Sequence, residues 1–218
     1  MITRISAKLS FGDPGYIGLP YWPERNTLIN ISKQVHPKLG PAKKEAALLA
    51  TLEGMGMTRA QYREICELAM RPFYTDNSRR DGEIVIPQRV IQSFLNNASQ
   101  SAPRVIPRIN SKGLTFIGVT LDGGCLHTGM HESDAKKFER FVRMAGDAKS
   151  GRGSNQPIWC SSDYIADFIA YGTFMVDEEI VKAEDLRKLM EYGGRWLGVG
   201  SARPQGFGRF QVVEWDVM

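Results

Sequence analysis

The chain begins with a strict alternation of apolar and polar side chains. The apolar positions are Ile5, Ala7, Leu9 and Phe11, and the polar positions between them are Arg4, Ser6, Lys8 and Ser10. A period of two is typical of a strand that buries one face. We therefore predict a half-buried strand over residues 2–11.

Helical patterns follow. PAKKEAALLATLEG (41–54) has Pro41 at its first position and Gly54 at its end, which indicates a helix. A second helix is predicted from Thr58, because Thr58 and Gln61 match a capping box, to about Met70. EIVIP (83–87) predicts a short strand and VIQSFLNNA (90–98) a helix. Apolar residues at helical spacing after Ser133 predict another helix over 133–145.

The last third of the chain returns to strand patterns. DFIAYGTFMV (167–176) predicts a strand, AEDLRKLMEY (183–192) a helix that ends at Gly193 and Gly194, and GFGRFQVVEWDV (206–217) the final strand. Strands and helices thus interleave along the chain, which favours an α+β fold with a mostly antiparallel sheet.

The segment between the last predicted helix and strand is rich in glycine and arginine. GGRWLGVGSARPQGFGRF (193–210) contains six glycines and three arginines. Repeated glycines let main-chain amides approach a ligand closely, and arginine offers planar donors that suit phosphate. The segment matches neither a dinucleotide fingerprint nor a P-loop, because it runs from helix to strand and lacks the lysine motif. It predicts either a phosphate-binding loop or a loop with demanding turns and surface arginines.

This segment resembles the glycine-rich loop of the RAMP superfamily, the repeat-associated RNA-binding proteins of CRISPR effector complexes. The shared pattern is a helix, then GG-x-x-x-G-x-G-x-x-R-x-x-G-F-G-R-F before a terminal strand. RRDGEIVIPQRVIQSFLNNAS (79–99) is similar to a second family segment, although Gln88 and Arg89 stand where many relatives have small residues.

The resemblance implies a modified ferredoxin-like (RRM-like) sheet with an inserted helical elaboration. We expect one RAMP-like domain over residues 1–218, with a helical and hairpin insertion at roughly 33–156. Within the family, chains of this length are most similar to the backbone subunit that polymerises along guide RNA. The partners implied are single-stranded guide RNA, other copies of the chain and other effector-complex subunits.

The resemblance also implies which residues contact RNA. By this resemblance they are Gly198, Gly200, Arg203, Gly206, Gly208 and Arg209 in the loop. To these predicted RNA-binding residues we add Arg195 of the same segment, together with Arg89, Lys149 and Arg152. The last two lie in GDAKSGRGSNQ (146–156), a glycine- and serine-rich stretch that is predicted to be a loop over the RNA.

Composition narrows the class of protein only moderately. The 218 residues carry a formal net charge of +4, and residues 1–113 hold 16 lysines and arginines against 9 acidic residues. A basic half is compatible with a polyanionic partner or with an ordinary solvated face. No apolar run approaches membrane-spanning length, so we expect no membrane partner. Three cysteines and no export signal favour a cytoplasmic location with reduced thiols.

The histidines give only weak indications of a catalytic or metal-binding site. His36 lies in a basic stretch and is the best candidate for a general acid or base, which leaves open a metal-independent RAMP endoribonuclease that processes guide RNA. Cys125, His127 and His131, with Cys160, have residue types that bind zinc, but Gly129 disfavours the helix that His-x₃-His needs. We therefore expect no metal or cofactor. A third possibility is a solitary viral or mobile-element protein that mimics a backbone subunit and binds host effector proteins.

Overall fold

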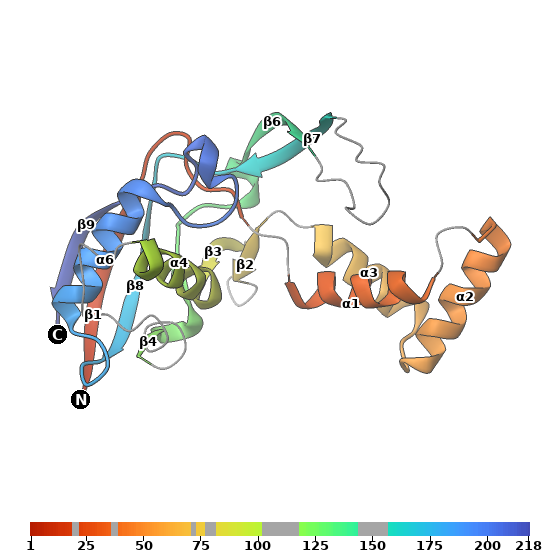
Figure 1. Ribbon diagram of the computed structural model, residues 1–218, viewed down its shortest axis with the longest axis horizontal. Coiled ribbons are helices and arrows are strands. Elements are labelled where there is room, and N and C mark those ends of the chain that lie inside the picture. Colours follow the sequence, from red (N-terminus) through yellow and green to blue (C-terminus); the bar gives the residue numbers. More distant parts are fainter. Residues whose placement is uncertain (19–21, 36–38, 71–72, 77–81, 102–117, 144–156) are drawn as a thin grey trace. The chain divides into compact units, whose positions relative to one another are not determined.

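The computed structural model describes residues 1–18, 22–35, 39–70, 73–76, 82–101, 118–143 and 157–218 (Figure 1). Their contacts divide into two compact units, one formed by Met1–Gly18 with Thr75–Met218 and the other by Leu19–Tyr74. Within the described residues, no helix is long and apolar enough to cross a bilayer.

The larger unit is built on an antiparallel sheet. Its described strands follow the order β2-β3-β5-β8-β1-β9, and β4 also pairs with β8. The strands are β1 (Ile2–Phe11), β2 (Tyr74–Asp76), β3 (Glu83–Pro87), β4 (Val119–Leu121), β5 (Cys125–His127), β8 (Phe168–Asp177) and β9 (Gln211–Val217). The first and last strands of the chain are therefore neighbours, and the predicted α+β fold with an antiparallel sheet is confirmed.

Two helices, α4 (Gln88–Ser101) and α6 (Ala183–Trp196), pack against each other in this unit (Figure 1). The alternation predicted for β1 is present, because Ile5, Ala7, Leu9 and Phe11 are all buried. The ring of Phe210 lies 5.3 Å from Phe11 on β1 and 5.3 Å from Phe94 on α4, measured between ring centroids. The helices thus cover one face of the sheet, and the polar positions of β1 lie on the other.

A two-stranded sheet is formed by β6 (Lys136–Arg143) and β7 (Pro157–Tyr164). The prediction of a helix over 133–145 is therefore wrong. Of the apolar residues in that pattern, Phe138 packs onto the glycine-rich segment, where its ring centroid lies 4.8 Å from that of Phe207.

The smaller unit consists of three helices, α1 (Trp22–Gln34), α2 (Pro41–Gly54) and α3 (Arg59–Met70). The capping box predicted before α3 is present: the backbone N–H of Thr58 donates to Gln61 Oε1 at 2.8 Å, and that of Gln61 donates to Thr58 Oγ1 at 3.2 Å. Ile31 and Leu52 are buried in this unit.

The predicted insertion over 33–156 includes α2 and α3 but also residues of the main sheet. The strands β3, β4 and β5 and the helix α4 belong to the larger unit. The arrangement of the chain as one RAMP-like domain stays a prediction. Asn110, Ser111, Lys112 and Gly113, the residues that would form the turn of the hairpin expected within this insertion, lie outside the described residues.

Candidate nucleic-acid interface

A groove of about 800 Å³ opens beside the end of α6 and the residues that follow β1. Arg195, Gly206 and Arg209 line it from the glycine-rich segment, and Ser10 and Asp13 line it from the other side. Three residues that the sequence assigned to RNA binding are thus brought to one concave surface. Arg195 and Arg209 are both exposed, so their guanidinium groups are accessible to an anion.

The helix α6 sets the position of Arg195. It continues through Gly193 and Gly194 to Trp196, so the predicted end of the helix at these glycines is wrong. A Cβ atom on Gly193 would lie 2.5 Å from the ring of Phe94, and one on Gly194 would lie 2.7 Å from the ring of Phe210. These glycines therefore allow close packing inside the helix, and Arg195 lies in its last turn.

Beyond α6, three glycines are required by the fold of the loop itself. Gly208 has φ +76°, and a Cβ atom there would lie 1.8 Å from the carbonyl oxygen of Val199. A Cβ atom on Gly198 would lie 2.7 Å from the carbonyl oxygen of Phe207, and one on Gly200 would lie 2.4 Å from that of Ile17. The chain's own backbone fills the space in front of these three residues.

Hydrogen bonds hold the loop against the segment after β1. The N–H of Ser201 donates to the carbonyl of Ile17 at 3.0 Å, and that of Gly208 donates to the carbonyl of Gly15 at 2.6 Å. The loop is therefore a fixed support for Arg209 rather than a free chain. Gly206 differs from the other loop glycines, because it lines the groove and a Cβ atom there would meet only Pro14, at 3.8 Å.

The groove also carries two carboxylates that the motif did not reveal. Asp13 lies two residues after the end of β1, and Glu191 lies on α6, where it accepts a hydrogen bond from Arg187 Nε at 2.9 Å. Both reduce the positive charge of the groove. Sequence analysis could find Arg195 and Arg209 from one motif. Asp13 is distant in the chain and reaches the groove through the pairing of β1 with β9 and the hydrogen bonds between the loop and the segment after β1.

The remaining predicted residues lie elsewhere. Arg203 is half-buried in a short 3₁₀ turn, Arg203–Gln205, and is not among the residues that line the groove. Arg89 lies at the start of α4, where its charge opposes the effect of burial on the pKa of Tyr16. His36, Lys149 and Arg152 lie outside the described residues.

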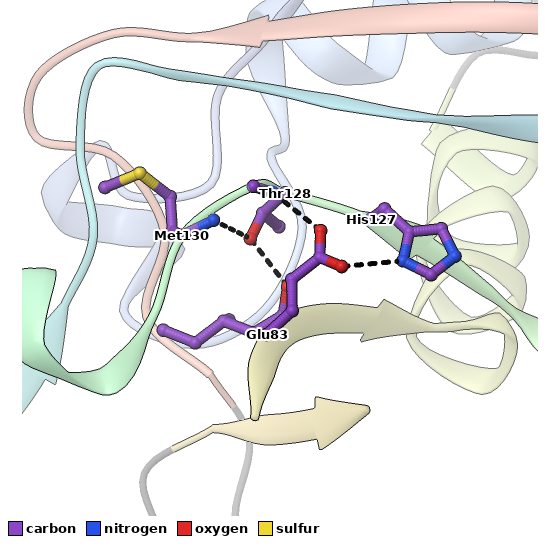
Figure 2. Close-up of polar contacts among 6 residues, drawn as sticks. Glu83, His127, Thr128 and Met130 are labelled. Carbon is purple, nitrogen blue, oxygen red and sulfur yellow. Dashed lines mark hydrogen bonds and ion pairs between the residues drawn. The ribbon is translucent and has the colours of Figure 1, made fainter. Parts of the chain in front are cut away.

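Two of the four zinc-type residues, His127 and His131, have hydrogen-bond partners of another kind in the structure. His127 Nδ1 lies 3.1 Å from Glu83 Oε2 (Figure 2), whereas the backbone N–H of His131 donates to Asp134 Oδ2 at 2.8 Å. Among the described residues, no group of three or more histidines, cysteines or carboxylates is arranged to hold a metal ion. Glu83 was missed by sequence analysis, because it lies 44 residues before His127 and inside an apolar strand.

Comparison with known proteins finds a similarity of fold but none of sequence. No family model matches the chain, and no curated protein matches it in sequence. Among solved structures, the whole chain superposes on a chain in the cryo-EM structure of the type III-B Cmr-beta complex bound to cognate target RNA, with a TM-score of 0.51 and 10% identity. The chain spans 61% of the length of that neighbour.

A second solved structure is less similar. Cmr6 from Pyrococcus furiosus aligns over 97% of both chains at 12% identity, and its TM-score of 0.29 is too low to indicate a shared fold. The first likeness covers the whole chain and is a likeness of fold. The chain is therefore similar in fold to a chain of the type III-B Cmr-beta complex.

Proposed function

We propose that the chain is an RNA-binding subunit of a CRISPR-type ribonucleoprotein, which coats single-stranded guide RNA through its phosphates. The observation that carries this proposal is the groove in which Arg195 and Arg209 meet beside Gly206. The fold supports it, because a structural neighbour is part of a complex bound to target RNA.

The chemistry of the groove suits a phosphate backbone. Each guanidinium offers planar N–H donors that match phosphate oxygens, and both arginines stand on backbone that packing holds in place. Contacts of this kind hold the RNA without reading its sequence. Affinity should therefore depend steeply on salt, since each neutralised phosphate releases counterions.

The test is a comparison of two double variants with equal change in charge. Arg195→Ala/Arg209→Ala removes both groove arginines. Lys182→Ala/Lys188→Ala removes two exposed cations that do not line the groove, one at the N-cap of α6 and one within that helix. We expect the first pair to weaken binding of a single-stranded RNA and to reduce the slope of log K against log salt by about 1.4. Equal losses in the two pairs would contradict a role for the groove.

Nucleic acid carried through purification is the simplest first readout. We expect short RNA in a high-mass fraction, absent from the groove variant. A nucleic-acid-free monomer that ignores added RNA would contradict the proposal and would favour a role in binding effector proteins.

The proposal includes head-to-tail assembly of several copies along the RNA, with contacts to other effector-complex subunits. Such an interface joins two different surfaces of the chain and does not close into a dimer. Sedimentation with RNAs of increasing length should show a rising number of bound chains. One chain for each RNA at every length would contradict assembly while leaving RNA binding intact.

A further inference from the structure

The face of the main sheet opposite α4 and α6 carries a row of polar and aromatic side chains. The strand register pairs Tyr171 on β8 with Lys8 on β1 and with His127 on β5. Paired residues of neighbouring strands point to the same face. Lys8, Tyr171 and His127 therefore lie side by side on three adjacent strands.

His127 is held in one orientation by a buried carboxylate. Figure 2 shows Glu83 Oε2 facing His127 Nδ1, at 3.1 Å, while Glu83 Oε1 accepts the N–H of Gly129 at 2.8 Å. The Glu83 side chain is only 4% exposed. In the tautomer in which Nδ1 donates to Glu83 Oε2, Nε2 is the ring nitrogen that can accept a hydrogen bond from a ligand.

The turn next to this pair is fixed as well. Thr128 Oγ1 donates to the carbonyl of Ile84 at 2.6 Å and accepts the N–H of Met130 at 3.1 Å (Figure 2). These bonds tie the end of β5 to β3. The imidazole thus stands on rigid backbone, which is the condition for a preorganised binding group.

Tyr171 provides an aromatic surface beside the imidazole. The two ring centroids lie 5.7 Å apart with 31° between the ring planes, and Tyr171 is 39% exposed. Exposed aromatic rings on a sheet are platforms on which unpaired bases stack, and each stacked base contributes about 1–3 kcal/mol.

Lys8 supplies a cation on the other side of Tyr171. Its Nζ lies 2.6 Å from Glu214 Oε2, and this hydrogen bond and charge raise the pKa of Lys8. Both side chains are exposed, and exposed pairs of this kind are weak. A phosphate can therefore replace the carboxylate as the partner of Lys8.

The row and the groove both include residues of β1, and α6, which lines the groove, lies on the opposite face of the sheet. Ser10 lines the groove and lies two residues beyond Lys8 on the same face of β1, a separation of about 7 Å.

We propose that Lys8, Tyr171 and His127 form a nucleotide subsite, in which a base stacks on Tyr171, His127 Nε2 contacts the base edge or ribose, and Lys8 faces the phosphate. This subsite rests on the proposed function in its choice of RNA as ligand. The subsite adds a contact with a base to the phosphate contacts that we propose for the groove.

The experiment compares a uridine oligonucleotide with an oligonucleotide of the same length and charge that lacks bases. We expect Tyr171→Ala to weaken binding of the uridine oligonucleotide about tenfold and to leave the abasic one unchanged. Tyr171→Phe keeps the ring and should bind as the unaltered protein does. Ile169→Ala is the matched control, because Ile169 is a neighbouring exposed residue on the same face of β8.

Each result decides one of the two proposals. The subsite would be overturned if Tyr171→Ala binds the uridine oligonucleotide as tightly as the unaltered protein does, or if it loses equal affinity for both oligonucleotides. A loss of affinity for both oligonucleotides in Arg195→Ala/Arg209→Ala concerns the groove and not the subsite. If the unaltered protein binds neither oligonucleotide, the proposed function fails. The subsite is then decided by titration with uridine monophosphate, and unchanged NMR resonances of the His127 ring would overturn it.

Discussion

Gly208 and Val199 lie in such close contact that no side chain fits between them. The N–H of Val199 donates to the carbonyl of Gly208 at 2.8 Å, and a Cβ atom on Gly208 would lie 1.8 Å from the carbonyl oxygen of Val199. The loop that carries Arg209 is therefore closed on itself by its own backbone. Glycine is needed at this position for packing, whatever the loop binds.

The first prediction concerns this contact. Gly208→Ala should lower the free energy of unfolding by about 3 kcal/mol, because the new methyl group meets backbone atoms and φ is +76°. Denaturant unfolding measures the loss. Gly123→Ala is the control, since Gly123 has φ +75° and open space around it, and it should lose only about 1 kcal/mol. Equal losses would show that strain in φ, and not the contact with Val199, is the cause.

The second prediction concerns the packing of α6 on α4. Alanine is favoured over glycine inside a helix by about 1 kcal/mol, but a methyl group on Gly193 would lie 2.5 Å from the Phe94 ring and 3.0 Å from the Ala98 methyl group. We expect Gly193→Ala to destabilise the protein by about 1–3 kcal/mol in thermal or denaturant unfolding.

A double variant separates this contact from other effects. Phe94→Leu removes the ring, so Gly193→Ala should cost less in that background than in the unaltered protein. Gly54→Ala, at the end of α2 with nothing within 4 Å, should be close to neutral. An additive double variant would show that the Phe94 ring is not what excludes a side chain at position 193.

Much of this fold is visible in local sequence patterns, and the exceptions share a cause. The strand at Ile2–Phe11 and the helix at Pro41–Gly54 follow from period and capping residues, which act over a few positions. The strand β6 does not, because its pairing with β7 and the contact of Phe138 with Phe207 join residues distant in the sequence. The prediction for the end of α6 is also wrong, because Gly193 is typical of a helix end in the sequence, whereas in the structure it lies inside the helix and packs against Phe94.

The candidate site divides in the same way. Arg195 and Arg209 belong to one dense motif, so the sequence could point to them. Asp13 and Ser10 join the groove because β1 and β9 are adjacent in the sheet, and the partnership of Glu83 with His127 depends on the pairing of β3 with β5. Patterns along the chain carry no signal for such contacts.

The third prediction uses the carboxylate in the groove. Asp13 shares the groove with Arg195 and Arg209, where its charge repels phosphate. If RNA passes through the groove, Asp13→Asn should raise the affinity for single-stranded RNA by about two- to fivefold at low salt. Fluorescence anisotropy with a labelled RNA measures the change.

The control for this variant has the same change in charge. Asp185 lies in the first turn of α6 and does not line the groove, so Asp185→Asn should alter affinity less. Weaker binding by Asp13→Asn would mean that this carboxylate supports the bound RNA, and equal gains in both variants would mean that only net charge matters.

The last prediction concerns Tyr16, which packs beneath the glycine-rich loop and is 1% exposed. Burial raises the pKa of its phenol, against the smaller opposing effect of Arg89. Above a pH of about 10 an unfolded chain loses this proton while the folded protein keeps it. The unfolded state then binds fewer protons, so the free energy of unfolding falls as pH rises, by up to about 1.4 kcal/mol for each pH unit.

Tyr16→Phe should remove this part of the loss of stability at alkaline pH. Urea unfolding of both proteins between pH 8 and 11 measures the free energy of unfolding. The difference between the two proteins at pH 8 gives the effect of the substitution that does not depend on pH. Parallel curves for the two proteins would show that Tyr16 ionises as readily in the folded chain as in the unfolded one.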